Sequence, residues 1–129
     1  MKHIKLFEKF KEFNVKSLKN DIHGILVELK DIGHYIDVNF RTEYNSNKYI
    51  VTVTIQTGNK MMITGTDIHQ YILTLIDYMK YKLDSKFTTK YLYWDIYPQE
   101  WRYFNYCIYP SNNNRKYYGF KIEFEKESN

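Results

Sequence analysis

The sequence predicts an α+β protein, a two-layer sandwich in which two main helices cover one face of an antiparallel sheet of five to six strands. Two stretches show the helical spacing of apolar residues, and each is followed by segments in which apolar and polar residues alternate. Alternating strands have one apolar face that needs a cover, and two amphipathic helices supply it. The 129 residues are enough for one such domain with a real core.

Residues 1–16 are expected to form a short basic amphipathic segment, with a short helix, ahead of a single domain over residues 17–129. The apolar side chains of this segment share one side: Leu6, Phe7, Phe10 and Phe13. All of the chain's surplus positive charge lies in residues 1–20, and the remainder is electrically balanced. This balance argues against a generally basic nucleic-acid-binding domain. A helix this short is marginal alone, so we expect it to dock on a surface or target the chain.

The two main helices are expected over residues 18–32 and 67–83. Ser17 is expected to be the N-cap of the first helix, and Gly33 suits the left-handed residue that ends it. Thr66 is expected to cap the second helix, whose first turn carries an acidic residue that complements the helix dipole.

Strand patterns fill most of the remaining chain. The predicted strands cover residues 34–43, 48–57, 60–64, 87–97, 101–109 and 117–125. Residues 44–47 form a hairpin loop between the first two strands. In the last strand Phe120, Ile122 and Phe124 share one face, and charged residues occupy the other.

The two helical stretches resemble each other in sequence. DIHGILVELKD (Asp21–Asp31) and DIHQYILTLID (Asp67–Asp77) share Asp, Ile, His, a later Leu and a final Asp. Two explanations stay open: duplication of a unit of one helix and three strands, or convergence of two capped amphipathic helices on a similar pattern.

Candidate catalytic residues are few, and we predict no catalytic site, metal site or cofactor. His23 and His69 each lie two residues after an aspartate, so neither shares a helix face with that neighbour. The single cysteine, Cys107, has no local base and cannot complete a zinc site. Asp95 and Glu100 flank a turn, where paired carboxylates are usually only solvated. No glycine-rich phosphate loop is present.

The candidate binding surface is an aromatic stretch near the end of the second half. In an alternating strand Tyr91, Tyr93 and Tyr97 share one face, while the face with Leu92 and Trp94 is apolar enough to be core. The following strand adds Trp101 and Arg102, and Lys90 and Lys86 are further local cations. If exposed, the tyrosine row could anchor a protein partner or stack the bases of single-stranded nucleic acid. A covered sheet face is the third interpretation, because Tyr is abundant throughout this alanine-free, Asn-, Ile- and Lys-rich chain.

The first ten residues, MKHIKLFEKF, resemble the short N-terminal leaders on many proteins of contractile-tailed bacteriophages. DIHGILVELKDIGHYIDVNF also resembles a helix and strand of small uncharacterised phage proteins. The leader resemblance implies a capsid-targeting segment with Leu6, Phe7, Phe10 and Phe13 as its docking face, cut after Glu8 or Glu12. No small residue follows a clear acidic cut site here, which departs from that pattern.

Taken together, the sequence favours a small non-enzymatic phage-type accessory or virion-associated protein that binds another protein. The alternative is a single-stranded nucleic-acid-binding protein. A lone cysteine and the lack of a secretory leader favour the host cytoplasm or the virion over secretion. The apolar runs are too short to cross a bilayer, so no membrane partner is expected, and the pattern leaves the oligomeric state undetermined.

Overall fold

The computed structural model describes residues 15–43, 45, 47–58, 61–83, 86–96, 99–104 and 116–127. Its helices are α2 (Val15–Ile25), α3 (Val27–Asp31) and α4 (Gly65–Lys82). Its strands are β1 (Tyr35–Glu43), β2 (Lys48–Gln56), β3 (Ile63–Thr64), β4 (Thr88–Asp95), β5 (Glu100–Phe104), β6 (Lys116–Tyr117) and β7 (Gly119–Glu127).

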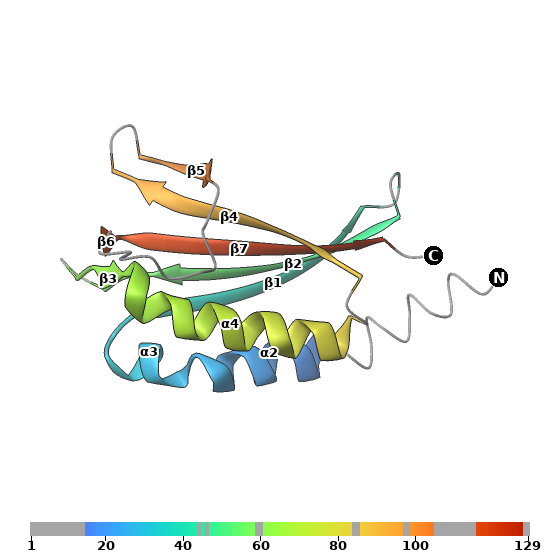
Figure 1. The fold of residues 1–129 in the computed structure, drawn as a ribbon, viewed down its shortest axis with the longest axis horizontal. Helices are drawn as coiled ribbons and strands as arrows, with labels where there is room; N and C mark the ends of the chain where they lie inside the picture. The colour runs from blue at the N-terminus through green and yellow to red at the C-terminus, as the bar shows by residue number, and fades with distance from the viewer. Residues whose placement is uncertain are drawn as a thin grey trace.

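A five-stranded antiparallel sheet forms one layer of the molecule, with the strand order β1-β2-β7-β4-β5, and β3 pairs with β6 in a second, small sheet. The three helices lie along the same face of the large sheet (Figure 1). The predicted two-layer α+β sandwich is therefore confirmed.

The first main helix is interrupted rather than continuous. It consists of α2 and α3, and Leu26 stands between them with φ −99° and ψ 13°. The helix begins at Val15, so Ser17 lies inside it and the predicted Ser17 cap is wrong. The boundary predicted between residues 16 and 17 also falls within α2. Gly33 has φ 104°, and this left-handed residue ends the helical stretch as predicted.

Helix α4 begins earlier than the sequence pattern suggested. Thr64, not Thr66, is the N-cap: its backbone is extended, and its Oγ1 accepts a hydrogen bond from the Asp67 backbone N–H at 3.1 Å. This bond satisfies one of the donors that the first helical turn leaves unpaired. Both Gly65 and Thr66 are thus helical, and Asp67 stands in the first turn, where its charge complements the helix dipole.

The core lies between the helices and the large sheet, and β7 runs through its centre. Phe120, Ile122 and Phe124 of β7 are fully buried, as the period of two predicts. Cross-strand registers place Val53 of β2 beside Ile122, and Val38 of β1 beside Val53. From the helices the core receives Leu18, Ile22, Leu26, Leu29, Ile68, Ile72, Leu75 and Met79.

The strand order does not repeat between the two halves. In the half that follows α4, the last strand, β7, joins the large sheet by pairing with β4 on the side away from β5. In the half that follows α3, the last strand, β3, lies outside the large sheet and pairs with β6. Two equivalent units of one helix and three strands would place their third strands alike. The arrangement therefore favours convergence of the two helix sequences over duplication.

Several predicted features lie outside the described residues. These are the N-terminal segment with Leu6, Phe7, Phe10 and Phe13, the residues Tyr97 and Cys107, and most of the strand predicted over 101–109.

Candidate functional site

The tyrosine row does not form a free surface, and the faces of β4 are the reverse of those predicted. Tyr91 is only 8% exposed and faces the helices, and Tyr93, on the same face, packs against the core. In register, Tyr91 lies opposite Ile122 and Tyr93 lies opposite Phe120, so both tyrosines continue the apolar rows of β7. The Tyr91 ring lies 6.3 Å from that of Phe120.

The reversal has a physical cause that the sequence of β4 alone does not contain. Both faces of this strand carry large, partly apolar side chains, so alternation defines two faces but does not say which one is covered. Pairing with the neighbouring strand, β7, determines which face of β4 is covered. The face of β7 with Phe120 and Ile122 is the covered one, and the register fixes Tyr91 and Tyr93 to the same side.

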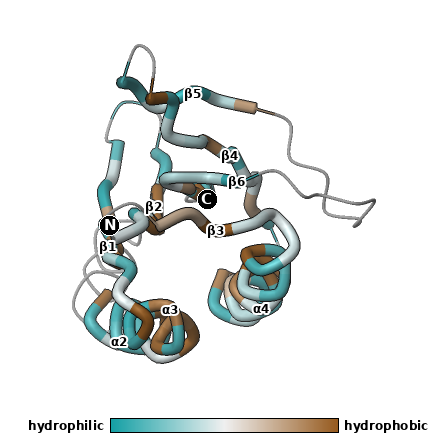
Figure 2. Tube along the Cα trace, turned by 90° about the vertical axis from the view of Figure 1, so that its left-hand side faces the viewer, coloured by the Kyte–Doolittle hydropathy of each residue, from teal (hydrophilic) through white to brown (hydrophobic). Residues whose placement is uncertain are grey.

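The opposite face of the sheet, here called the open face, points away from the three helices. Figure 2 shows the helices together on the other side of the sheet. At its β4–β5 end the open face carries an aromatic cluster, defined as Leu92, Trp94, Trp101, Tyr103 and Lys121. Register pairs Trp94 with Trp101 and Leu92 with Tyr103 across the β4–β5 hairpin.

The two tryptophans of the aromatic cluster pack on each other and on the backbone of β7. Their rings are 5.4 Å apart and inclined at 68°, an edge-to-face arrangement that aromatic pairs favour. A Cβ built on Gly119 would stand 3.0 Å from both the Trp101 ring and the Trp94 Cβ. Trp101 thus reaches across β4 onto β7, and the absence of a side chain at Gly119 makes the room.

Lys121 completes the cluster from β7. Its Nζ lies 4.2 Å from the centre of the Trp101 ring, within the range of a cation–π interaction. Burial lowers the pKa of Lys121, while the nearby carboxylates of Glu123 and Asp37 act in the opposite direction. The ammonium group is thus partly withdrawn from water and held against an aromatic face.

The aromatic cluster is unevenly exposed. Leu92 is only 5% exposed although it faces away from the helices, and in the register it lies between Tyr103 and Lys121. Tyr103 itself is 64% exposed, which makes it the most accessible aromatic side chain of the cluster. An accessible tyrosine beside a shielded apolar floor is a combination common at protein contacts.

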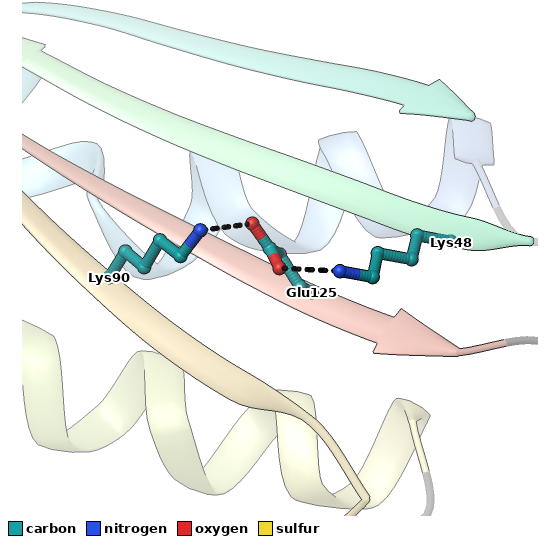
Figure 3. A network of polar contacts seen from close by, with 3 residues as sticks. All are labelled: Lys48, Lys90 and Glu125. Carbon is teal, nitrogen blue, oxygen red and sulfur yellow. Dashed lines mark ion pairs between the residues drawn. The ribbon is translucent and has the colours of Figure 1, made fainter. Parts of the chain in front are cut away.

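Two of the cations predicted to serve a binding site, Arg102 and Lys90, are engaged in ion pairs. Arg102 Nε lies 2.8 Å from Asp95 Oδ2, and its Nη2 lies 3.1 Å from Glu100 Oε1. On the open face Lys90 Nζ lies 3.0 Å from one oxygen of Glu125, and Lys48 Nζ lies 3.9 Å from the other (Figure 3). These pairs largely neutralise the local positive charge.

Five of the six predicted binding residues are described, and they are divided between two faces; the sixth, Tyr97, lies outside the described residues. Lys90 and Trp101 lie on the open face, whereas Tyr91, Tyr93 and Arg102 lie on the helix side, as the pairing of Tyr93 with Arg102 shows. Sequence reasoning missed Trp94, Tyr103 and Lys121 as members of one surface. The pairing of β4 with both β5 and β7 was the missing signal, because it depends on contacts distant in sequence.

Within the described part of the chain, the residues considered for catalysis do not assemble into a site of their own, and Cys107 lies outside that part. Asp95 and Glu100 do meet, but both carboxylates form ion pairs with the Arg102 guanidinium. His23 belongs to α2 and His69 to α4, and burial lowers the pKa of His23. Among the described residues no group of three or more His, Cys, Asp or Glu side chains could hold a metal ion.

Comparison with protein-family models, curated proteins and solved structures gives no match for this chain. In the described part of the chain no helix combines the length and the apolar character needed to cross a membrane.

Proposed function

We propose that this chain is a small non-enzymatic binding protein that contacts another protein through the aromatic cluster on the open face of its sheet. The observation that supports this most is the exposed Tyr103 on the same face of the β4–β5 hairpin as Trp94 and Trp101, away from the helices. Tryptophan and tyrosine supply much of the binding energy at protein interfaces, because they bury a large area with few rotatable bonds.

Local charge favours a protein partner over single-stranded nucleic acid. Binding of nucleic acid needs free cations along a groove, and the cluster's neighbours Lys90 and Arg102 are both paired with carboxylates. Glu123 and Asp37 add negative charge to the open face, near Lys121. A phosphate backbone would meet this surface with little net attraction.

The setting we propose for this activity is a bacteriophage, where the chain would act as an accessory or virion-associated protein. This part of the proposal is supported by the resemblance of residues 1–10 and 21–40 to phage proteins. Its test is mass spectrometry of purified virions and of infected host cells, which would show where the chain accumulates.

The binding proposal is tested by affinity capture from those cells with three baits: the unchanged chain, Tyr103→Arg and Tyr81→Arg. Tyr81 on α4 is 78% exposed and serves as a matched control on the helical layer. We expect one protein to be enriched by the unchanged chain and by Tyr81→Arg and to be lost with Tyr103→Arg, because a charge there disrupts an aromatic contact.

Two outcomes would count against the proposal: no specific protein is recovered, or the same protein is recovered equally by all three baits. A titration with a labelled single-stranded oligonucleotide tests the alternative. Tight binding that weakens steeply as salt rises would replace the protein partner with nucleic acid.

A further inference from the structure

Strand β1 is an edge of the large sheet, and its sequence is complementary to itself. It pairs with β2 over nine consecutive residues and is the terminal strand in the sheet order. The outer margin of such a strand carries backbone N–H and C=O groups that can pair with a further strand. Figure 2 shows β1 at one margin of the sheet, with α2 and α3 beneath it.

Three features that often protect an edge strand are missing from β1. It contains no proline, its register with β2 has no bulge, and its helix-facing positions Ile36 and Val38 are apolar rather than charged. Among the described residues, three exposed large hydrophobic side chains lie close together along the chain: Val27 in α3, Ile32 in the turn that follows it and Tyr35 at the start of β1. This edge of the sheet therefore offers backbone groups that can pair with a further strand, together with exposed apolar side chains near them.

The charged side chains along β1 indicate which strand could pair with this edge. Asp37 and Arg41 both point to the open face, where the Asp37 carboxylate acts to raise the pKa of Lys121 and the Arg41 guanidinium acts to lower it. They are four residues apart in one strand, a separation of about 13 Å, so they cannot pair within one copy. If two copies of β1 meet antiparallel with Asn39 at the centre, Asp37 of each copy stands opposite Arg41 of the other.

We propose that a second copy of this chain is the partner of this edge, through antiparallel pairing of the two β1 strands about a twofold axis at Asn39. This register uses all nine residues of both strands and creates two opposite-charge cross-strand pairs. The two five-stranded sheets then form a single continuous sheet of ten strands. The aromatic clusters lie at its far ends and face the same side, so the dimer leaves both clusters accessible.

The pairing is tested on the full chain by sedimentation equilibrium from low micromolar to near-millimolar concentration. We expect the unchanged chain to form a dimer. Arg41→Asp places like charges opposite each other twice, as does Asp37→Arg, and each should weaken dimerisation about tenfold or more. Lys80→Asp on the outer surface of α4 changes the net charge by the same amount as Arg41→Asp and should leave the dimer unaltered.

Two further samples keep the test independent of folding defects. The double variant Asp37→Arg, Arg41→Asp restores both attractive pairs and should dimerise like the unchanged chain. An equimolar mixture of the two single variants should form a mixed dimer, although neither variant associates with itself. Monomer at every concentration, single variants that still dimerise, or failure of both the double variant and the mixture would each overturn the proposal. None of these results depends on the aromatic cluster or its partner.

Discussion

At the residue scale, Gly119 determines how the aromatic cluster packs. A side chain there would meet the Trp94 Cβ, which the β4 backbone fixes, and the Trp101 ring, both at 3.0 Å. Gly119→Val should therefore destabilise the fold by about 1–3 kcal/mol, because forced overpacking displaces the indole or the strand. Chemical denaturation monitored by tryptophan fluorescence measures this change.

Gly24 provides the matched glycine control. It lies in α2, and a Cβ built on it has no neighbour within 4 Å. Gly24→Ala should stabilise the protein by about 0.5–1 kcal/mol, since alanine loses less backbone entropy in a helix. If both substitutions had the same sign, the close packing described around Gly119 would be incorrect.

A second single-residue effect comes from His34, which makes the stability of the fold depend on pH. Its side chain is buried, its Nδ1 accepts a hydrogen bond from the Gly58 backbone N–H at 3.4 Å, and burial lowers its pKa. The unfolded chain therefore binds a proton more readily than the folded chain. The contribution of neutral His34 to the free energy of unfolding is therefore complete above the pKa of histidine in the unfolded chain, about 6.5. It is lost as the pH falls through the lower pKa of His34 in the folded chain.

Denaturation midpoints at pH 7.5 and pH 5.5 test this expectation. The unchanged protein should be less stable at the lower pH, and His34→Gln should reduce that difference. His23 adds a contribution of the same sign, because burial also lowers its pKa. A difference that is identical in His34→Gln would show that His34 does not contribute to it.

At the scale of elements, polar contacts on the surface connect the helices. The Tyr78 hydroxyl of α4 donates to Asp21 Oδ2 of α2 at 2.6 Å, and the Tyr71 hydroxyl of α4 donates to Glu28 Oε2 of α3 at 2.9 Å. Burial, together with the hydrogen bond to Asp21, raises the pKa of Tyr78. The Tyr78 hydroxyl therefore stays protonated, and able to donate, at neutral pH.

Tyr78→Phe should lower the free energy of unfolding by about 0.5–1.5 kcal/mol, because it deletes one hydrogen bond to a charged acceptor that solvent partly screens. Tyr81→Phe removes a hydroxyl from the same helix at an exposed position and should change stability by less than about 0.5 kcal/mol. Equal effects of the two substitutions would mean that the contact between Tyr78 and Asp21 does not stabilise the helix pair.

The elements also show how far sequence alone could lead. In β7 the faces were predictable, because Phe120, Ile122 and Phe124 alternate with charged residues. In β4 they were not, because both faces are rich in aromatic side chains and only pairing with β7 separates them. The Thr64 cap was missed for a similar reason: Thr64 and Thr66 are equally good caps, and the backbone geometry decides between them.

At the scale of the whole molecule, helical cover divides the sheet into two chemically different faces. One is buried beneath α2, α3 and α4 and contains the apolar rows. The other combines the ion pairs around Glu125 with the aromatic cluster at the β4–β5 end. This asymmetry is the basis of the proposed protein contact, and no motif in the sequence indicates it.

Site-specific photo-crosslinking tests that contact most directly. A benzophenone amino acid replaces either Tyr103 on the open face or Tyr81 on the helical layer, both exposed tyrosines, and cells containing the chain are irradiated. The proposal predicts a discrete crosslinked protein from position 103 and none from position 81. Crosslinks from position 81 alone, or from neither position, would contradict the assignment of the open face as the binding surface.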